Sequence, residues 1–298
     1  MTEPAWYDTG EFLKGRYLIQ MKTMKIVTDS SSNILDMEDV AFAAAPLKVI
    51  TNEREFVDGN ALDVSEMVSW FDSYKGKSKT SCPNPNDWLE AFGDADDVFC
   101  VTITSGLSGS YNAACIAKEM YESEHEGRRV CVIDSLSAGP ELVLIIEKLE
   151  ECILKGMAYE DICTVIGEYT KTTGLVFMLE SLKNFAANGR VSPAVAKIAG
   201  VLGIRIVGKA SDKGTLEPTN KCRGEGKSLV AILSHLKESG LSTGKVRIAH
   251  CMNENAAHTL KDMIRQEIPQ ADVQMHSCRG LCSYYAEKGG LLVGFEKV

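Results

Sequence analysis

From residue 24 onward, short apolar runs rich in β-branched residues alternate with stretches whose apolar residues recur every three to four positions. The first kind of run is typical of buried strands and the second of amphipathic helices. An alternation of this kind predicts an α/β fold whose first part is an open, largely parallel sheet with flanking helices. In the first half we predict strands at Met24–Thr28, Leu47–Ile50, Val98–Thr104 and Val130–Ile133, and helices at Val64–Tyr74, Asn86–Phe92, Ser110–Ser123 and Glu141–Lys155.

The second half has a different order of elements. It begins with two helical patterns, Met178–Asn188 and Pro193–Leu202, and then two strand-like runs flank a predicted hairpin turn at Ser211–Gly214. The change predicts two α/β domains, 24–175 and 176–298, after an N-terminal extension at 1–23, with a tail that is free to return to the first domain. The remaining predicted elements are a helix near Lys227–Lys237, a strand at Lys245–Cys251, a helix at Glu254–Gln266, a strand at Val273–Ser277 and the apolar ending GGLLVGF.

Composition narrows the classes of protein. The chain has 298 residues, a net charge of −9 and 45% hydrophobic residues, which is ordinary for a globular protein and argues against binding nucleic acid through overall charge. Cysteines such as Cys100 lie inside apolar runs, which favours a reducing compartment. No signal peptide and no membrane span of about 18 apolar residues is recognisable. We therefore expect a cytoplasmic monomer without stable membrane insertion.

The charge is unevenly distributed. Between Lys183 and Lys227 there are nine basic and three acidic residues, a local charge of +6, which leaves −15 on the rest of the chain. Most charge runs are solvated faces, but such asymmetry also steers an acidic partner toward a docking surface. Both interpretations stay open at this point.

Three polar segments offer hydroxyl groups, at residues 28–33, 79–83 and 102–110. We place all three at the ends of strands, where open α/β sheets bind ligands. Each also has a purely structural interpretation as a turn or helix cap. Together they provide hydroxyls and amides without an obvious base, which favours binding of an anionic head group over bond breaking.

The segment Gly106–Ser110 resembles the nucleophile elbow G-x-S-x-G, except that Ser110 replaces its last glycine. A serine hydrolase that uses Ser108 is therefore the alternative function, and a small-anion or phosphate-binding enzyme is a third.

Other chemical motifs are incomplete. Gly224–Ser228 ends like a phosphate-binding P-loop, but Lys221 occupies the position of its first glycine. His276, Cys278 and Cys282 lack a second pair at zinc-type spacing. We therefore expect no cofactor and no metal.

Several segments together resemble the DegV family, bacterial proteins that bind a long-chain fatty acid. They are MKIVTDSSSN, TSCP, ITSGLSGSYNAA, CVIDSLSAG, NGRVS and GTLEPTNKCRG. The resemblance implies two α/β domains with the ligand at the domain junction, where a fatty acid such as palmitate lies in a buried tunnel with its carboxylate on hydroxyl residues. The apolar stretches Leu142–Ile146, Leu175–Leu179 and Val195–Leu202 either line such a tunnel or belong to the ordinary core.

The resemblance also assigns residues. It implies Thr80 and Ser108 as the main carboxylate ligands, and the full set of residues implied to bind the carboxylate is Thr80, Ser81, Gly106, Ser108, Arg190 and Tyr285. Asp29, Ser30 and Ser105 are expected near the head group.

Two positions depart from the family pattern, since Cys82 replaces a glutamine and Tyr285 a histidine. A tyrosine can donate a hydrogen bond to a carboxylate but, unlike a histidine, does not take up an additional proton near neutral pH.

Finally, the resemblance implies a partner. Members of the family present the fatty acid to a separate kinase that phosphorylates it for phospholipid synthesis, so the chain itself is expected to be a lipid-binding carrier and not an enzyme. The basic segment then provides a docking surface, for which Lys221 and Arg223 are the first candidates.

Overall fold

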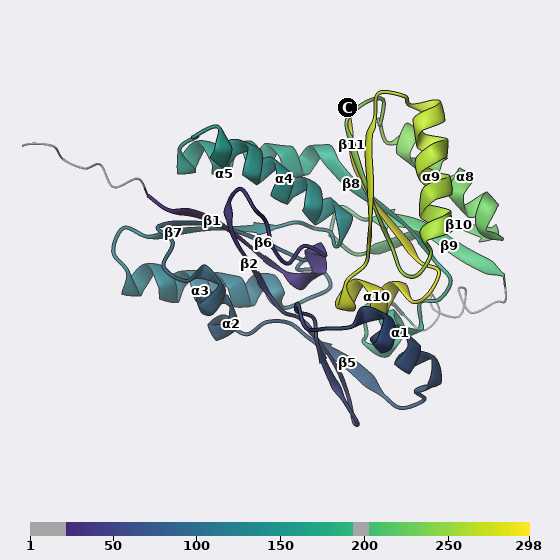
Figure 1. Ribbon diagram of the computed structural model, residues 1–298, viewed down its shortest axis with the longest axis horizontal. Coiled ribbons are helices and arrows are strands. Elements are labelled where there is room, and N and C mark those ends of the chain that lie inside the picture. Colours follow the sequence, from purple (N-terminus) through teal and green to yellow (C-terminus); the bar gives the residue numbers. More distant parts are fainter. Residues whose placement is uncertain (1–21, 193–202) are drawn as a thin grey trace, which may run out of the picture.

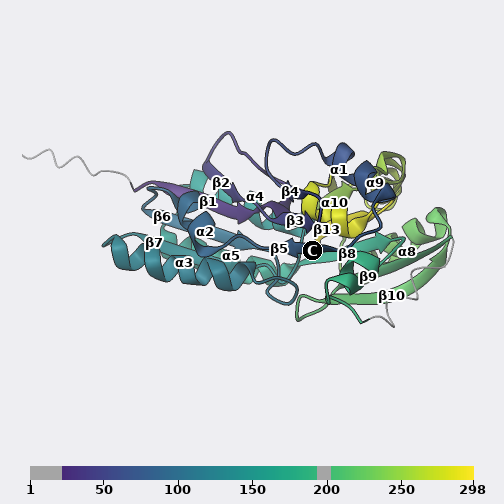
Figure 2. The same ribbon diagram turned by 90° about the horizontal axis from the view of Figure 1, so that it is seen from below.

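The computed structural model describes residues 22–192 and 203–298, and these form three sheets (Figure 1). Most of the predicted extension 1–23, the predicted helix Pro193–Leu202 and the apolar stretch Val195–Leu202 lie outside the described residues. Viewed from below, the first sheet and its helices lie at one end of an elongated molecule and the largest sheet at the other (Figure 2).

The first sheet has four parallel strands in the order β2-β1-β6-β7. Alternate side chains of a strand point to opposite faces. Thus Val27 and Val98 pack toward α2 and α3, whereas Ile26 and Phe99 pack toward α4 and α5. The predicted open parallel sheet with flanking helices is confirmed. Its elements are β1 (Met24–Asp29), β2 (Ala41–Ala45), β6 (Asp97–Thr102), β7 (Arg129–Asp134), α2 (Pro85–Phe92), α3 (Ser110–Glu124), α4 (Pro140–Leu154) and α5 (Tyr159–Tyr169).

The second sheet is mixed and has six strands in the order β10-β9-β8-β13-β11-β12, of which only β11 and β12 pair in parallel. Helices α8 and α9 cover one face with an apolar core that includes Ile232 and Leu260. Helix α4 packs on the sheet as well, and it comes so close to β13 that a side chain at Gly294 would lie 2.5 Å from the backbone of Pro140. The elements are β8 (Thr173–Leu179), β9 (Ile204–Ala210), β10 (Leu216–Arg223), α8 (Glu225–Glu238), β11 (Lys245–His250), α9 (Glu254–Glu267), β12 (Asp272–Ser277) and β13 (Leu291–Glu296).

A small antiparallel sheet, β4-β3-β5, lies beside the other two. Val49 and Phe56 of this sheet pack on Met67 of α1. Helix α10, near the C-terminus, contacts β3, α1 and the short 3-10 helix η1 that follows β1, so one tail segment returns to the first half while β13 stays in the second sheet. The elements are β3 (Lys48–Thr51), β4 (Glu55–Val57), β5 (Ser78–Ser81), α1 (Val64–Ser73), α6 (Lys183–Ala187), α10 (Gly280–Ala286), η1 (Ser30–Ser32) and η2 (Thr170–Thr172).

Two sequence-based expectations need correction. Residues 79–83 do not form a loop at a strand end of the main sheet, because Thr80 and Ser81 belong to β5 and pair with β3. The predicted helix Met178–Asn188 is the end of strand β8 followed by the short α6, since a run as apolar as Leu175–Leu179 fits a buried strand equally well. The predicted domain boundary between residues 175 and 176 lies within β8, and the division into domains stays a prediction.

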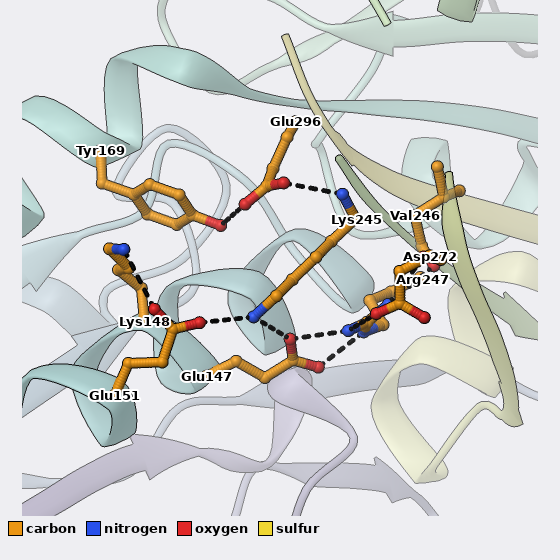
Figure 3. Close-up of polar contacts among 9 residues, drawn as sticks. All are labelled: Glu147, Lys148, Glu151, Tyr169, Lys245, Val246, Arg247, Asp272 and Glu296. Atoms are coloured by element: carbon orange, nitrogen blue, oxygen red, sulfur yellow. Dashed lines mark hydrogen bonds and ion pairs between the residues drawn. The ribbon is translucent and has the colours of Figure 1, made fainter. Parts of the chain in front are cut away.

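An ion-pair network joins α4 to β11 (Figure 3). The Arg247 guanidinium, 3% exposed, donates to both carboxylate oxygens of Glu147 at 2.6 and 2.8 Å. Lys245 lies 3.0 Å from Glu147 and 2.8 Å from Glu151. A buried charge without a partner destabilises the folded state, so the buried Arg247 requires its pairing with Glu147. The bidentate pair therefore fixes the position of α4, a helix of the first sheet, on the second sheet.

Candidate functional site

A cavity of about 300 Å³ lies where the three sheets meet. Its wall comes from β5, the turns after β6 and β7, strands β8, β9 and β10 and helix α10. Most of the wall is apolar, which suits a hydrocarbon, and several hydroxyl groups lie among the apolar side chains. The apolar lining residues are Leu47, Ile103, Leu107, Ala138, Leu175, Phe177, Leu179, Phe185, Ala210, Leu216, Leu281, Ala286 and Leu292.

Strand β5 and helix α10 bring Thr80 and Tyr285 together on this wall. The Thr80 Oγ1 and Tyr285 hydroxyl oxygens are 2.8 Å apart, and the Tyr285 ring lies 4.6 Å from the ring of Phe185. Burial raises the pKa of Tyr285, while the hydrogen bond with Thr80 lowers it to a smaller extent. The phenol therefore stays neutral near pH 7 and is available as a hydrogen-bond donor.

Asn188 connects the same two elements. It belongs to the segment NGRVS, but the sequence analysis assigned no role to it. Its side-chain oxygen accepts from the Thr80 backbone N–H at 3.1 Å, and its Nδ2 donates to the Tyr284 hydroxyl at 3.0 Å. That hydroxyl is also 2.7 Å from Ser78 Oγ. The residue after α6 thereby holds β5 against α10.

Arg190 and Ser108 lie on the cavity wall with Thr80 and Ser81. The Arg190 Nε donates to the Leu107 carbonyl at 3.0 Å, which keeps the guanidinium next to the turn that carries Ser108. Among the described residues, Arg190 is the only charged side chain on the wall. A carboxylate bound here would meet one cation and several neutral donors.

The remaining candidates do not line the cavity. Asp29 is fully buried behind it, where its carboxylate accepts hydrogen bonds from Ser31, the Ile103 N–H and the Ser110 hydroxyl. Burial raises the pKa of Asp29. Ser30 Oγ accepts from the Leu47 N–H at 3.0 Å. Both residues therefore hold the turns together and are not part of the cavity wall.

Ser105 and Gly106 belong to the turn after β6. Ser105 is exposed, and its N–H donates to Asp134 at 3.0 Å. A side chain at Gly106 would come within 2.5 Å of the Lys213 carbonyl, so this glycine allows the tip of the confirmed β9–β10 hairpin to close over the turn. Neither residue lines the cavity.

Within the part of the chain that the structure describes, no general base lies beside Ser108. Its Oγ accepts from the Ser110 N–H at 3.3 Å. Among the described residues, no histidine, aspartate, glutamate or lysine lines the cavity. A nucleophilic serine needs a base within hydrogen-bond reach, so the geometry does not support the hydrolase alternative.

Asp58 is a residue that the sequence analysis missed. Its carboxylate oxygens accept from the backbone N–H groups of Gly280 and Leu281, both at 2.8 Å, across 222 and 223 positions of sequence. It thus satisfies the first amides of α10, the helix that carries Tyr285. Arg279 occupies the N-cap position of α10, and its side chain makes no hydrogen bond to the helix amides. An arginine at this position is the one sequence signal that a distant residue caps the helix.

Within the described ranges 22–192 and 203–298, no group of three or more His, Cys, Asp or Glu side chains is arranged to hold a metal ion. All ten cysteines are free thiols. None of the helices in those ranges has the length and apolarity needed to cross a membrane.

Comparison with known proteins gives consistent matches. The family model described as "Uncharacterised protein, DegV family" matches residues 23–297. A DegV domain-containing protein of Streptococcus pneumoniae is 40% identical over 278 residues, covering 92% of this chain and 99% of the relative.

Two solved structures are also similar. A DegV family protein from Eubacterium eligens loaded with heptadecanoic acid is 44% identical with a TM-score of 0.91, and the match covers 93% of this chain and all of that one. The Streptococcus pneumoniae Fatty Acid Kinase (Fak) B3 protein loaded with linoleic acid is 40% identical with the same TM-score and the same coverage.

Proposed function

The chain belongs to the DegV family, and we propose that it binds a long-chain fatty acid and presents the carboxyl group to a separate fatty acid kinase. The observation that carries this proposal is the cavity itself, whose mostly apolar wall also carries neutral hydroxyls and, among the described residues, a single arginine. Two relatives that are at least 40% identical over 93% of this chain hold fatty acids.

The expected energetics agree with such a ligand. Burying about 14–16 methylene groups at ~0.8 kcal/mol each contributes roughly 11–13 kcal/mol before the costs of association. The hydrocarbon tail then dominates affinity, while the polar groups set its direction. In this proposal the carboxylate accepts from Thr80, Ser108, Tyr285 and Arg190, with Ser81 beside them. Asp29, Ser30, Ser105 and Gly106 shape the turns around the head group without touching it.

A kinase partner is the second part of the proposal. The similar pneumococcal structure is described as a Fatty Acid Kinase B3 protein. Lys221 and Arg223 lie exposed on the edge strand β10, and within the described residues neither has an ion-pair partner. Arg205 of the same basic segment is instead paired with Glu180 and Glu225. Two unpaired cations on a sheet edge suit docking of an acidic surface.

The test of binding is lipid extraction. Protein purified in native form should release a fatty acid of about 14–18 carbons near one equivalent, identified by mass spectrometry, and delipidated protein should rebind it. Repeated absence of lipid together with no binding in calorimetry would contradict the function. A cytoplasmic location and a monomeric state are parts of the same proposal, tested by cell fractionation and by light scattering.

A further inference from the structure

A groove of about 1130 Å³ lies between the small sheet and helices α1, α6 and α10. These elements contact one another although they come from three separate parts of the chain (Figure 1). Among the described residues that line the groove, five are lysines and two are acidic, which gives the lining a charge of +3 in a protein of net charge −9. The charged lining residues are Lys75, Lys77, Lys79, Lys183, Lys288, Asp72 and Glu287.

Four of the five lysines are not neutralised by a carboxylate. Within the ranges 22–192 and 203–298, the ammonium groups of Lys77, Lys79 and Lys288 make no hydrogen bond or ion pair, and all three residues are exposed. The ammonium group of Lys75 donates to a backbone carbonyl at 3.4 Å. Lys183 is the exception, since it forms an ion pair with a glutamate at 3.2 Å. The groove therefore presents four positive charges to a partner.

Aromatic side chains lie among these lysines. Phe71 and Tyr74 line the groove from α1 and its end, and Tyr284 lines it from α10, with the ring centroids of Phe71 and Tyr284 5.2 Å apart. A cleft that combines charges of one sign with walls of low dielectric constant focuses the electric field, which raises the rate at which an oppositely charged partner is captured. The lining of this groove thus suits an acidic partner.

The groove and the cavity adjoin along β5 and α10. On β5, Ser78 lines the groove and Thr80 lines the cavity. On α10, Tyr284 lines the groove and the next residue, Tyr285, lines the cavity. The hydroxyl pairs Ser78–Tyr284 and Thr80–Tyr285, at 2.7 and 2.8 Å, are neighbouring links between the two elements. A partner in the groove therefore lies next to residues proposed to bind the carboxylate, the group that a kinase has to reach.

We propose that this lysine groove receives an acidic, protruding segment of the fatty acid kinase. The inference rests on the proposed function and adds a second docking surface to the one on β10. Lys183 is the first residue of the basic segment 183–227, whereas the other four lysines lie outside that segment and join it only in the fold. Exposed lysines also attract anionic membranes. A bilayer is flat, however, and a concave groove is complementary in shape to a protein segment.

The experiment measures acyl-phosphate formation by a fatty acid kinase, with the full-length protein loaded with fatty acid as the varied substrate. In the double variant Lys77→Glu with Lys79→Glu, kcat/KM should fall about tenfold or more at low ionic strength, because interfacial charges steer association. The loss should shrink near 1 M salt, where the Debye length is about 3 Å. Arginine at both positions keeps the charge and should keep the wild-type value. Lys288→Glu, in the turn after α10, should also lower kcat/KM, which a local disturbance of β5 does not explain.

The double variant Lys155→Glu with Lys171→Glu is the matched control. It changes the net charge equally through two exposed lysines that do not line the groove, so kcat/KM should stay as in the wild type. Equal losses in both double variants would overturn the inference, and so would a matching loss of fatty-acid affinity in the groove variants.

Wild-type kinetics in the groove variants would also overturn the inference. If these variants at the same time lost binding to phosphatidylglycerol vesicles, the groove would belong to a membrane contact and not to the kinase. Wild-type protein that holds no fatty acid, or that yields no acyl phosphate with the kinase, would overturn the proposed function itself. That outcome is distinguishable because it concerns the wild type alone.

Discussion

The hydroxyl of Tyr285 lies 2.8 Å from Oγ1 of Thr80, a residue 205 positions earlier in the chain. The contact joins helix α10 to strand β5, and both residues line the cavity. Each hydroxyl can donate one hydrogen bond and accept others. One of the pair can therefore donate to its neighbour while the other donates to a bound carboxylate.

Replacing Tyr285 tests this pair. We expect Tyr285→Phe to weaken fatty-acid binding by about tenfold or more, because a hydrogen bond to a charged group contributes about 1.5–3 kcal/mol. Binding by the wild type should stay constant between pH 6 and 8, since burial raises the pKa of Tyr285 and the phenol does not titrate there. Calorimetry across this pH range measures both effects.

Tyr285→His provides the contrast. An imidazole gains a proton as pH falls below about 6.5 and then attracts the carboxylate, so binding by this variant should strengthen from pH 8 to pH 6. A variant with affinity as independent of pH as the wild type would place residue 285 away from the head group.

Arg190 supplies the one charge on the described cavity wall. Arg190→Gln should lower affinity for a fatty acid by roughly 10- to 100-fold, because it removes a charge-assisted hydrogen bond of about 1.5–3 kcal/mol. Affinity for the methyl ester should change little, since the ester carries no charge. Lys183→Gln is the control, because Lys183 pairs with Glu287 and does not line the cavity. Equal losses for acid and ester would show a steric effect and not recognition of charge.

Asp29 should influence how stability depends on pH. Burial raises its pKa, so the folded protein holds the proton to higher pH than the unfolded chain, whose value is near 3.8. The contribution of Asp29 to the free energy of unfolding is then largest below about pH 4 and falls as pH rises through the folded-state pKa.

Asp29→Asn removes this titration. It should also cost about 1–3 kcal/mol, because an amide NH₂ group would face the N–H of either Ser31 or Ile103, both of which need an acceptor. Urea unfolding of both proteins from pH 4 to 7 should show a stability difference that shrinks as pH rises. A difference that grows with pH would reverse the sign of the assigned shift.

The ion-pair network in Figure 3 predicts that a substitution which removes one charge lowers the stability of the protein strongly. Glu147→Gln leaves the buried Arg247 with Asp272 as its carboxylate partner and should destabilise the protein by about 2–3 kcal/mol, less than the 3–5 of a fully buried pair because Glu147 is 22% exposed. Lys171→Ala breaks an exposed pair with Glu168 and should cost at most about 0.5 kcal/mol. Denaturant unfolding measures both losses of stability. Similar losses in the two variants would contradict a structural role of the network.

Arg223→Ala and Lys221→Ala test docking of the kinase. Both should lower the rate of acyl-phosphate formation by a fatty acid kinase without changing the lipid content of the protein, since β10 residues 221 and 223 do not line the cavity. The effect should diminish at high salt, because docking through exposed charges is screened. Lys209→Ala, which removes a lysine already paired with Glu217 on the same two strands, is the control. Wild-type rates in both variants would exclude this surface.

Local pattern was sufficient for much of the fold. The strand Met24–Asp29 and the helix Ser110–Glu124 lie where the sequence predicted them. The strand is a short apolar run that is buried continuously, and the buried positions of the helix recur every three to four residues. The short polar strand β5 was missed, since Ser78–Ser81 has neither an apolar run nor an alternating one. It forms only because β3 offers its backbone as a partner.

For the site, the sequence by itself determined the residue types: hydroxyls at Thr80 and Ser108, a cation at Arg190 and a tyrosine at 285, all on the cavity wall. The tertiary structure decided which polar groups face the cavity and which hold it together. Asp29 and Asp58 bond to backbone amides of distant segments, whereas Thr80, Ser108 and Tyr285 line the cavity. These distinctions depend on which segments meet in space, a property of packing that no local pattern along the chain records.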